Sequence, residues 1–176
     1  VTSDIPGLRR ALDDANHDAM LFVDGVSSIG SIEFRMDDWG VDLAVTGSQK
    51  GLMLPAGLGL LGVSAKALEA SKSATMRRAY FEFNDMVTLN ATGYFPYTPP
   101  TQLFHGLRKS LDRINAEGLD NVIARHHRLA EGVRHAVAAW GMDLMAADPS
   151  LYSDTVSAVR VPDDVDARDV IRIGYE

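Results

Sequence analysis

The first part of the chain contains three short apolar runs that end in polar residues. The run Met20–Val23 ends in a carboxylate at Asp24, and the run Val41–Val45 continues into small polar residues before Lys50. A third apolar run, Gly57–Val63, follows a loop that is rich in glycine and proline. Near-continuous apolar runs are typical of parallel strands that are covered on both faces. We therefore expect three strands at the centre of an α/β fold.

Helical patterns flank these predicted strands. A helix is expected to begin after a cap within residues 2–4, because Pro6 then lies in the favoured first turn. Ser64–Ala70 has the pattern of a short helix with Ser64 as its N-cap. Residues 27–32 are expected to form a loop with a short strand, and residues 36–40 a turn or a short helix.

The second half of the chain has the strongest helical periodicity. Thr101–Glu117 and Leu119–Trp140 each place apolar residues on one face, and Gly118 lies between them as a stop signal. Alternation over Val156–Val161 predicts a strand. Residues 166–176 predict the start of a further helix.

Residues 71–100 show no clear hydrophobic period. They contain many aromatic residues and are interrupted by glycine and proline. A long aperiodic segment inside a compact domain is usually a functional loop. We therefore expect a loop here, with aromatic side chains as anchors.

Composition narrows the classes of partner. A net charge of −7 argues against a nucleic acid or an anionic membrane surface, and no apolar run is as long as a membrane span. The chain has no cysteine, which excludes disulfides and thiolate metal sites and fits a reducing cytoplasm. His126 and His127 are adjacent on a predicted helix and cannot face one another, so no metal site is expected.

The two strand ends carry the candidate chemistry. A lysine at the mouth of two buried strands is unusual, because lysine is rarely buried unless it is paired or used. Lys50 could form a Schiff base, most commonly with pyridoxal phosphate, PLP. Asp24 could supply the carboxylate that keeps the pyridine nitrogen protonated, since ligands of open α/β sheets bind at the carboxyl ends of the strands. Taken alone, Asp24 would be interpreted as a turn residue and Lys50 as a solvated loop residue. The presence of both favours a cofactor site.

The local sequences around both residues resemble one family. Residues 24–28, Asp-Gly-Val-Ser-Ser, and residues 47–57, Gly-Ser-Gln-Lys-Gly-Leu-Met-Leu-Pro-Ala-Gly, resemble the class V, fold-type I PLP-dependent aminotransferases. The likeness continues through Tyr94–Pro100 and Leu107–Leu111. Within the class, the chain is most similar to the serine–glyoxylate and alanine–glyoxylate aminotransferases.

This resemblance implies a two-part organisation. Residues 1–117 would be the C-terminal half of a large PLP-binding domain, with a mainly parallel sheet and flanking helices. Residues 118–176 would begin a smaller α+β domain. The chain would then be an internal-to-C-terminal portion of a longer enzyme, and residues 71–100 would contact the second subunit of a homodimer.

The resemblance also assigns roles near the pyridine ring of PLP. Lys50 and Asp24 would be catalytic and would bind the cofactor, and Val26 would pack against the face of the ring. The family's substrate-binding arginine stands in an Arg-Ile-Gly sequence, which Arg172 copies. By position, however, Arg172 matches an earlier helix of the small domain, so the substrate-binding arginine is expected outside these residues.

Three further residues would lie near the cofactor phosphate. Gln49 is the stronger candidate and Ser48 the weaker one, since Ser48 also fits a turn with local side-chain bonding. Thr98 would reach the phosphate of the cofactor held by the partner subunit. The family's phosphate-binding tyrosine three positions earlier is replaced by Phe95, which has no hydroxyl group.

The activity implied is transamination between an amino acid, first of all L-serine, and glyoxylate, giving glycine and a 2-oxo acid. Lys50 would take the Cα proton of the amino acid and return it to the cofactor. Alternatives stay open: another donor such as alanine, a kynureninase-like hydrolase, a cysteine desulfurase, an inactive fragment or an interaction module. Desulfurases need a catalytic cysteine and usually a histidine before the lysine, where this chain has Gln49.

Overall fold

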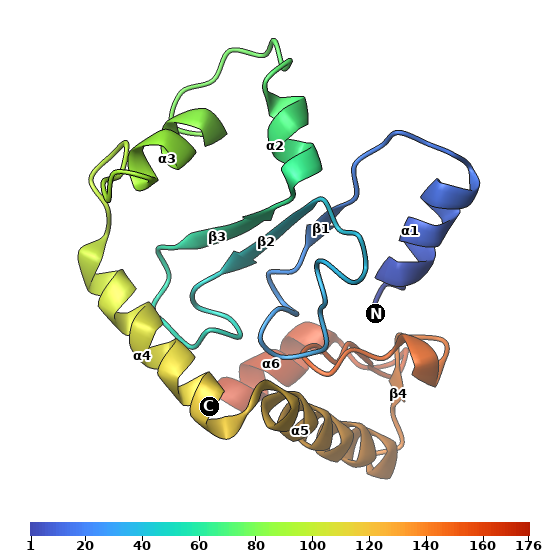
Figure 1. Ribbon diagram of the computed structural model, residues 1–176. Helices are drawn as coiled ribbons and strands as arrows, with labels where there is room; N and C mark the ends of the chain where they lie inside the picture. Colours follow the sequence, from blue (N-terminus) through green and yellow to red (C-terminus); the bar gives the residue numbers. More distant parts are fainter.

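The computed structural model describes residues 1–176 and shows an α/β arrangement with a central three-stranded sheet (Figure 1). No helix is long and apolar enough to cross a bilayer. In chain order, the elements are α1 Ile5–Asp14, β1 Phe22–Asp24, β2 Leu43–Gly47, β3 Gly59–Val63, α2 Ala65–Ser71, α3 Phe83–Asn90, α4 Thr101–Glu117, α5 Leu119–Ala139, β4 Asp143–Leu144, the 3₁₀ helix η1 Pro149–Leu151, β5 Val159–Arg160 and α6 Ala167–Tyr175.

The central sheet is mixed, with the strand order β1-β2-β3. The predicted parallel pair is present, and Asp24 of β1 lies opposite Val45 of β2. β3 runs antiparallel to β2, with Gly47 opposite Gly59. The expectation of a mainly parallel sheet is therefore met by one strand pair of this chain, because the loop after β2 turns straight back into its neighbour.

One face of the sheet forms the main core. Its buried residues pack beneath α1 and the segment that leads into β2: Leu21, Val23, Val41 and Ala44, with Ile5, Leu12, Ile29, Phe34, Met36 and Trp39 around them. The opposite face is open, since Phe22 is 60% exposed and Leu61 is 46% exposed. Within these residues, the sheet is therefore covered on one face.

A buried carboxylate fixes the starting ends of the strands. Asp42 is 5% exposed and accepts a hydrogen bond from the backbone N–H of Leu21 at 2.9 Å. The Ser64 hydroxyl donates to the same carboxylate at 3.3 Å, and Arg9 lies 3.8 Å from it. Since a buried carboxylate is tolerated only when it is bonded, Asp42 ties β1, β2 and the start of α2 together.

Local capping signals predicted the first two helices correctly. Asp4 caps α1, because its Oδ1 accepts a hydrogen bond from Gly7 N at 2.8 Å. Ser64 caps α2 in the same way, accepting from Ala67 N at 3.1 Å. In each case the side chain satisfies a backbone donor that the first helical turn leaves unpaired.

Two sequence expectations are wrong. Residues 27–32 form turns without a strand, and the segment 71–100 contains helix α3 instead of a loop throughout. Glu82 caps α3 through a hydrogen bond from Asn84 N at 3.0 Å, and Arg78 holds the Glu82 carboxylate at 2.6 Å. This helix is short and its apolar face is weak, so its periodicity was not visible.

The helices α4 and α5 follow each other across a sharp break. Gly118 separates them with φ +86°, a backbone conformation that favours glycine, and the predicted bounds of α4 are confirmed. The predicted strand at 156–161 is reduced to β5, which pairs with β4. Figure 1 shows α4 at the edge of the sheet region and α5 below it, near β4.

Candidate functional site

Asp24 stands at the carboxyl end of β1. Gly25 N donates to Val45 O at 2.9 Å, which continues the strand pairing by one residue. The backbone N–H of Val26 then donates to Asp24 Oδ1 at 3.0 Å. This bond turns the chain and fixes the carboxylate, which is exposed and has no ion-pair partner within the chain.

Lys50 stands just beyond the carboxyl end of β2. The strand ends at Gly47, and Lys50 N donates to Gly47 O at 3.3 Å, which closes a turn. The Lys50 side chain is exposed and has no ion-pair partner in the chain. Because β1 and β2 are parallel neighbours, Asp24 and Lys50 lie at the same edge of the sheet, as the sequence predicted.

Ser48 organises the loop that follows, residues 48–58, termed the lysine loop. Ser48 is fully buried, and its hydroxyl donates to Pro55 O at 2.8 Å and accepts from Leu58 N at 3.1 Å. The backbone of Leu54 also donates to Ser48 O at 3.0 Å. These contacts direct the Ser48 hydroxyl into the lysine loop and give it a supporting role there.

Helix α4 holds the lysine loop from outside. Leu52 and Leu54 form a buried cluster with Ile114 of α4, and the Ser110 hydroxyl donates to Leu52 O. A Cβ atom at Gly106 would lie 3.0 Å from Leu54 Cδ2, so the small residue allows close contact. The turn that carries Lys50 is therefore braced by packed side chains.

Two grooves meet at this edge of the sheet. The first, termed the Asp24 groove, has a volume of about 630 Å³ and is lined by Asp24 and Val26. The second, termed the lysine groove, has a volume of about 380 Å³ and is lined by Lys50 together with Ser31, Met53, Val122, Arg125, His126 and Asp154. Three residues line both grooves: Ser27, Thr155 and Val156.

Most charges in the lysine groove are neutralised by partners. Arg125 Nε lies 2.7 Å from Glu117 Oε1, and the hydrogen bond from Arg125 lowers the pKa of Glu117 below its ordinary value. The same bond raises the pKa of Arg125. Asp154 is bound by Arg134 and His127. Among the charged residues that line this groove, Lys50 alone lacks an ion-pair partner.

The remaining predicted site residues are placed differently. Gln49 is exposed beside the lysine, and a Cβ atom at Gly47 would lie 2.9 Å from Gln49 Oε1. Thr98 is exposed in a segment that lines a separate hollow, so it shares neither groove within one chain. Arg172 lies on α6 and pairs with Asp169 and Glu176.

Sequence reasoning missed the residues from the second half of the chain that complete the grooves. Arg125 and His126 of α5 and the segment 154–156 lie far along the chain from Asp24 and Lys50. The one signal in the sequence was the polar run Ser153–Thr155 just before a predicted strand. Such a run is common in loops, so only the fold reveals its position.

Comparison with known proteins supports one family. The sequence matches the family described as Aminotransferase class-V over residues 1–173. It is 58% identical to a serine–glyoxylate aminotransferase of Hyphomicrobium methylovorum over 177 residues, covering 99% of this chain and 44% of the relative. It is 60% identical to an L-aspartate–glyoxylate aminotransferase of Paracoccus denitrificans over 176 residues, covering 100% of this chain and 44% of the relative.

The fold gives the same result. The structure matches that of an alanine–glyoxylate aminotransferase from Nostoc sp. with a TM-score of 0.82 and 30% sequence identity. That match covers 94% of this chain and 44% of the Nostoc chain. The chain therefore spans less than half the length of the relatives that it matches.

Proposed function

The chain belongs to the class V aminotransferases, and we propose that it forms the lysine-bearing part of an enzyme that transfers an amino group to glyoxylate. Its fold is that of the fold-type I aminotransferases, and the family implies PLP as the cofactor. One observation carries the proposal. An unpaired amine, Lys50, and an unpaired carboxylate, Asp24, stand at the ends of adjacent parallel strands.

The chemistry of these groups fits PLP. The Asp24 carboxylate is oriented by Val26 N and lacks a cationic partner in the chain, so it can pair with a protonated pyridine nitrogen. The half-buried Val26 lies beside it and can contact the ring face. Lys50 offers an accessible amine to an aldehyde, and Gln49 is exposed next to it for a phosphate contact. Ser48 would support the turn instead of binding phosphate directly.

Asp24 and Lys50 would have different roles in the reaction. When bound, PLP supplies an electron sink for the carbanion formed at Cα of the amino acid. Asp24 holds the proton on the ring nitrogen, which keeps that sink effective. The Nζ atom of Lys50 would hold the cofactor and, as a free amine, would act as the general base for the Cα proton. The packed lysine loop fixes the backbone that carries the Lys50 side chain.

We propose L-serine as the amino donor and glyoxylate as the acceptor, giving glycine and a 2-oxo acid. Four of the relatives are named as glyoxylate aminotransferases, three with serine and one with L-aspartate, which supports glyoxylate more firmly than the donor. L-aspartate and L-alanine are the alternatives to test.

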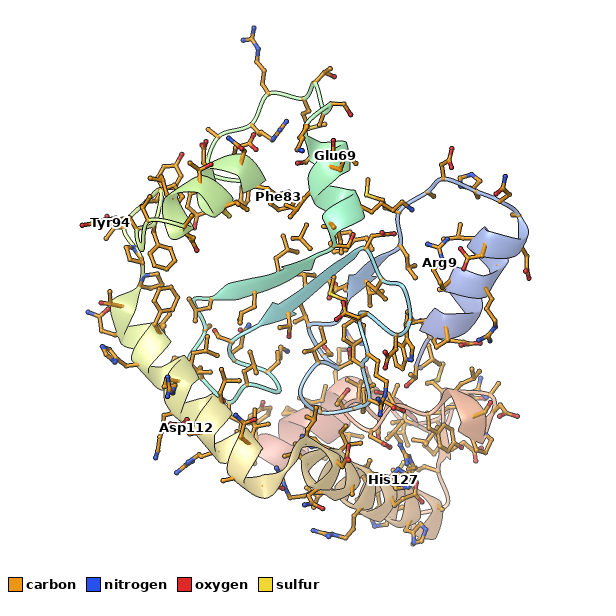
Figure 2. The ribbon with its side chains drawn as sticks, in the orientation of Figure 1. Arg9, Glu69, Phe83, Tyr94, Asp112 and His127 are labelled. Atoms are coloured by element: carbon orange, nitrogen blue, oxygen red, sulfur yellow. The ribbon has the colours of Figure 1, made fainter.

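We also propose a homodimer joined through the segment 71–100. Phe81 is 78% exposed and Tyr94 is 71% exposed, and Figure 2 shows Tyr94 on the outer side of the molecule. Exposed aromatic residues gathered on one segment are typical of interfaces. In such a dimer, Thr98 would reach the phosphate of the partner's cofactor.

Two broader assignments accompany this proposal. The break at Gly118 would divide the large PLP-binding domain, residues 1–117, from the small C-terminal domain that begins at 118–176. The absence of cysteine fits a cytoplasmic enzyme.

The proposal is tested by following glycine formation from glyoxylate in the enzyme that contains this chain. L-serine, L-aspartate and L-alanine are compared as donors, with Lys50→Arg and the matched control Lys109→Arg. We expect glycine with serine, its loss in Lys50→Arg and its retention in the control, since Lys109 is exposed on α4 away from the grooves. Unchanged glycine formation in Lys50→Arg would refute the assignment.

A further inference from the structure

A short segment in the second half of the chain forms the wall that the two grooves share. Thr155 and Val156 line both the Asp24 groove and the lysine groove. Residues 152–156, termed the wall segment, belong to no helix or strand. Their position therefore depends on contacts with neighbouring side chains and not on a backbone ladder.

Arg134 of α5 makes three of these contacts. Its side chain is 9% exposed, and Nη2 lies 2.6 Å from Asp154 Oδ1 and 3.0 Å from Ser153 O. The guanidinium carbon lies 5.2 Å from the centre of the Tyr152 ring, within the range of a cation–π contact. A second carboxylate, that of Glu131, pairs with Nη1. One buried side chain thus binds three successive residues of the wall segment.

Asp154 is bound at both of its oxygen atoms. Arg134 holds Oδ1, and His127 Nδ1 lies 3.0 Å from Oδ2; Figure 2 shows His127 on α5. On the other side, Thr2 donates through its backbone N–H to Leu151 O at 2.9 Å and through its hydroxyl to Tyr152 O at 3.0 Å. The wall segment is therefore tied to α5 and to the residues before α1.

We propose that Arg134 and Asp154 are positioning residues that hold Thr155 and Val156 against the cofactor site. This role rests on the proposed function, because the wall matters only if PLP and an amino acid occupy the grooves. Arg134 acts through the wall segment and lines neither groove. The planar fork of arginine is required, because Nη1 binds Glu131 while Nη2 binds Ser153 O and Asp154 Oδ1. The single amine of lysine could keep the charge but could not hold both sides at once.

The test measures the PLP concentration that gives half-maximal labelling of Lys50 after borohydride reduction, mapped by peptide mass spectrometry. Arg134→Lys, Arg134→Met and Asp154→Asn are each expected to raise this PLP concentration about tenfold, which corresponds to about 1.4 kcal/mol of binding free energy. The matched controls Arg128→Met and Asp164→Asn remove exposed charges that have no partners in the chain and should leave it unchanged. Hydrogen exchange over residues 151–157 is followed in parallel without cofactor.

The outcomes are separable. Faster hydrogen exchange of the wall segment together with weaker labelling of Lys50 supports the proposal. If the Arg134 and Asp154 variants fail to fold, His127→Gln is the milder variant, and it should shift both measurements in the same direction. Faster exchange with an unchanged labelling curve would overturn it, because the contacts would then serve stability alone. Absence of Lys50 labelling in the unmodified protein would instead refute the cofactor site, and the exchange data would show whether the wall still depends on Arg134.

Discussion

The backbones of Gly30 and Gly51 meet so closely that a Cβ atom on Gly51 would lie 3.0 Å from the carbonyl carbon of Gly30. The same Cβ atom would lie 2.3 Å from Ile29 O. This contact joins the loop after Asp24 to the turn after Lys50. The spacing between the two proposed catalytic residues is thus set by backbone packing as well as by strand pairing.

Gly51→Ala should disturb this contact. The added methyl group would meet backbone atoms that cannot move aside cheaply, so we expect a loss of about 1–3 kcal/mol in the free energy of unfolding. Urea denaturation measures this change. Gly59→Ala is the matched control, because nothing lies within 4 Å of a Cβ atom there. An equal loss in both variants would contradict the proposed contact.

Ser48→Ala should loosen the lysine loop. The change removes the hydroxyl that pairs with Pro55 O and Leu58 N, and leaving such groups without a partner costs about 1–3 kcal/mol. The midpoint of urea unfolding should fall accordingly. Ser73→Ala, which removes an exposed hydroxyl bonded to Ala70 O, should change stability by about 0.5 kcal/mol or less. If the two variants behave alike, Ser48 does not organise the loop.

The stabilising contribution of Asp154 to the wall segment should be lost in acid. Partial burial raises the pKa of Asp154, but hydrogen bonds from Arg134 and His127 outweigh it, and the net pKa lies below the ordinary value of 3.8. A carboxyl group with a lowered pKa in the folded state stabilises the protein above its unfolded pKa, and this contribution is lost as pH falls through the folded pKa.

The stability difference between the unmodified protein and Asp154→Asn should therefore be full near pH 7 and shrink below about pH 4. Urea unfolding at a series of pH values measures it. A difference that stays constant into acid would show that the Asp154 charge does not bind the wall segment.

The exposed aromatic residues of segment 71–100 should control dimer formation. Phe81→Ala or Tyr94→Ala is expected to weaken the dimer about tenfold, because buried aromatic anchors often dominate interface energies. Trp140→Ala is a suitable control, since Trp140 is 68% exposed but lies at the end of α5. Analytical sedimentation measures the dissociation constant of the dimer. A monomeric protein, or equal effects of all three changes, would contradict this interface.

Local signals predicted much of the fold. Asp4 and Ser64 cap helices because their oxygen atoms satisfy nearby backbone donors, and the glycine at position 118 ended α4 as expected. The apolar runs located the strands to within two residues, and parallel pairing then brought Asp24 and Lys50 to one edge. These features depend on neighbours within a few residues or on a simple pairing rule.

The features that were missed depend on distant contacts. Helix α3 has a weak apolar face and is fixed by the Arg78–Glu82 pair, and the open sheet face at Phe22 cannot be read from an apolar run alone. Nothing local in the sequence indicates that Arg134 and Asp154 meet across two segments. Their meeting, and the groove wall that it forms, required the folded chain.

The most direct test of the central claim is to find which lysine binds PLP. The purified protein is incubated with PLP, reduced with borohydride and mapped by peptide mass spectrometry, with Asp24→Asn in parallel. We predict that the pyridoxyl group lies on Lys50, with little on Lys66, Lys72 or Lys109, and that Asp24→Asn weakens this preference. Equal labelling of all these exposed lysines in the unmodified protein would contradict a cofactor site at the ends of β1 and β2.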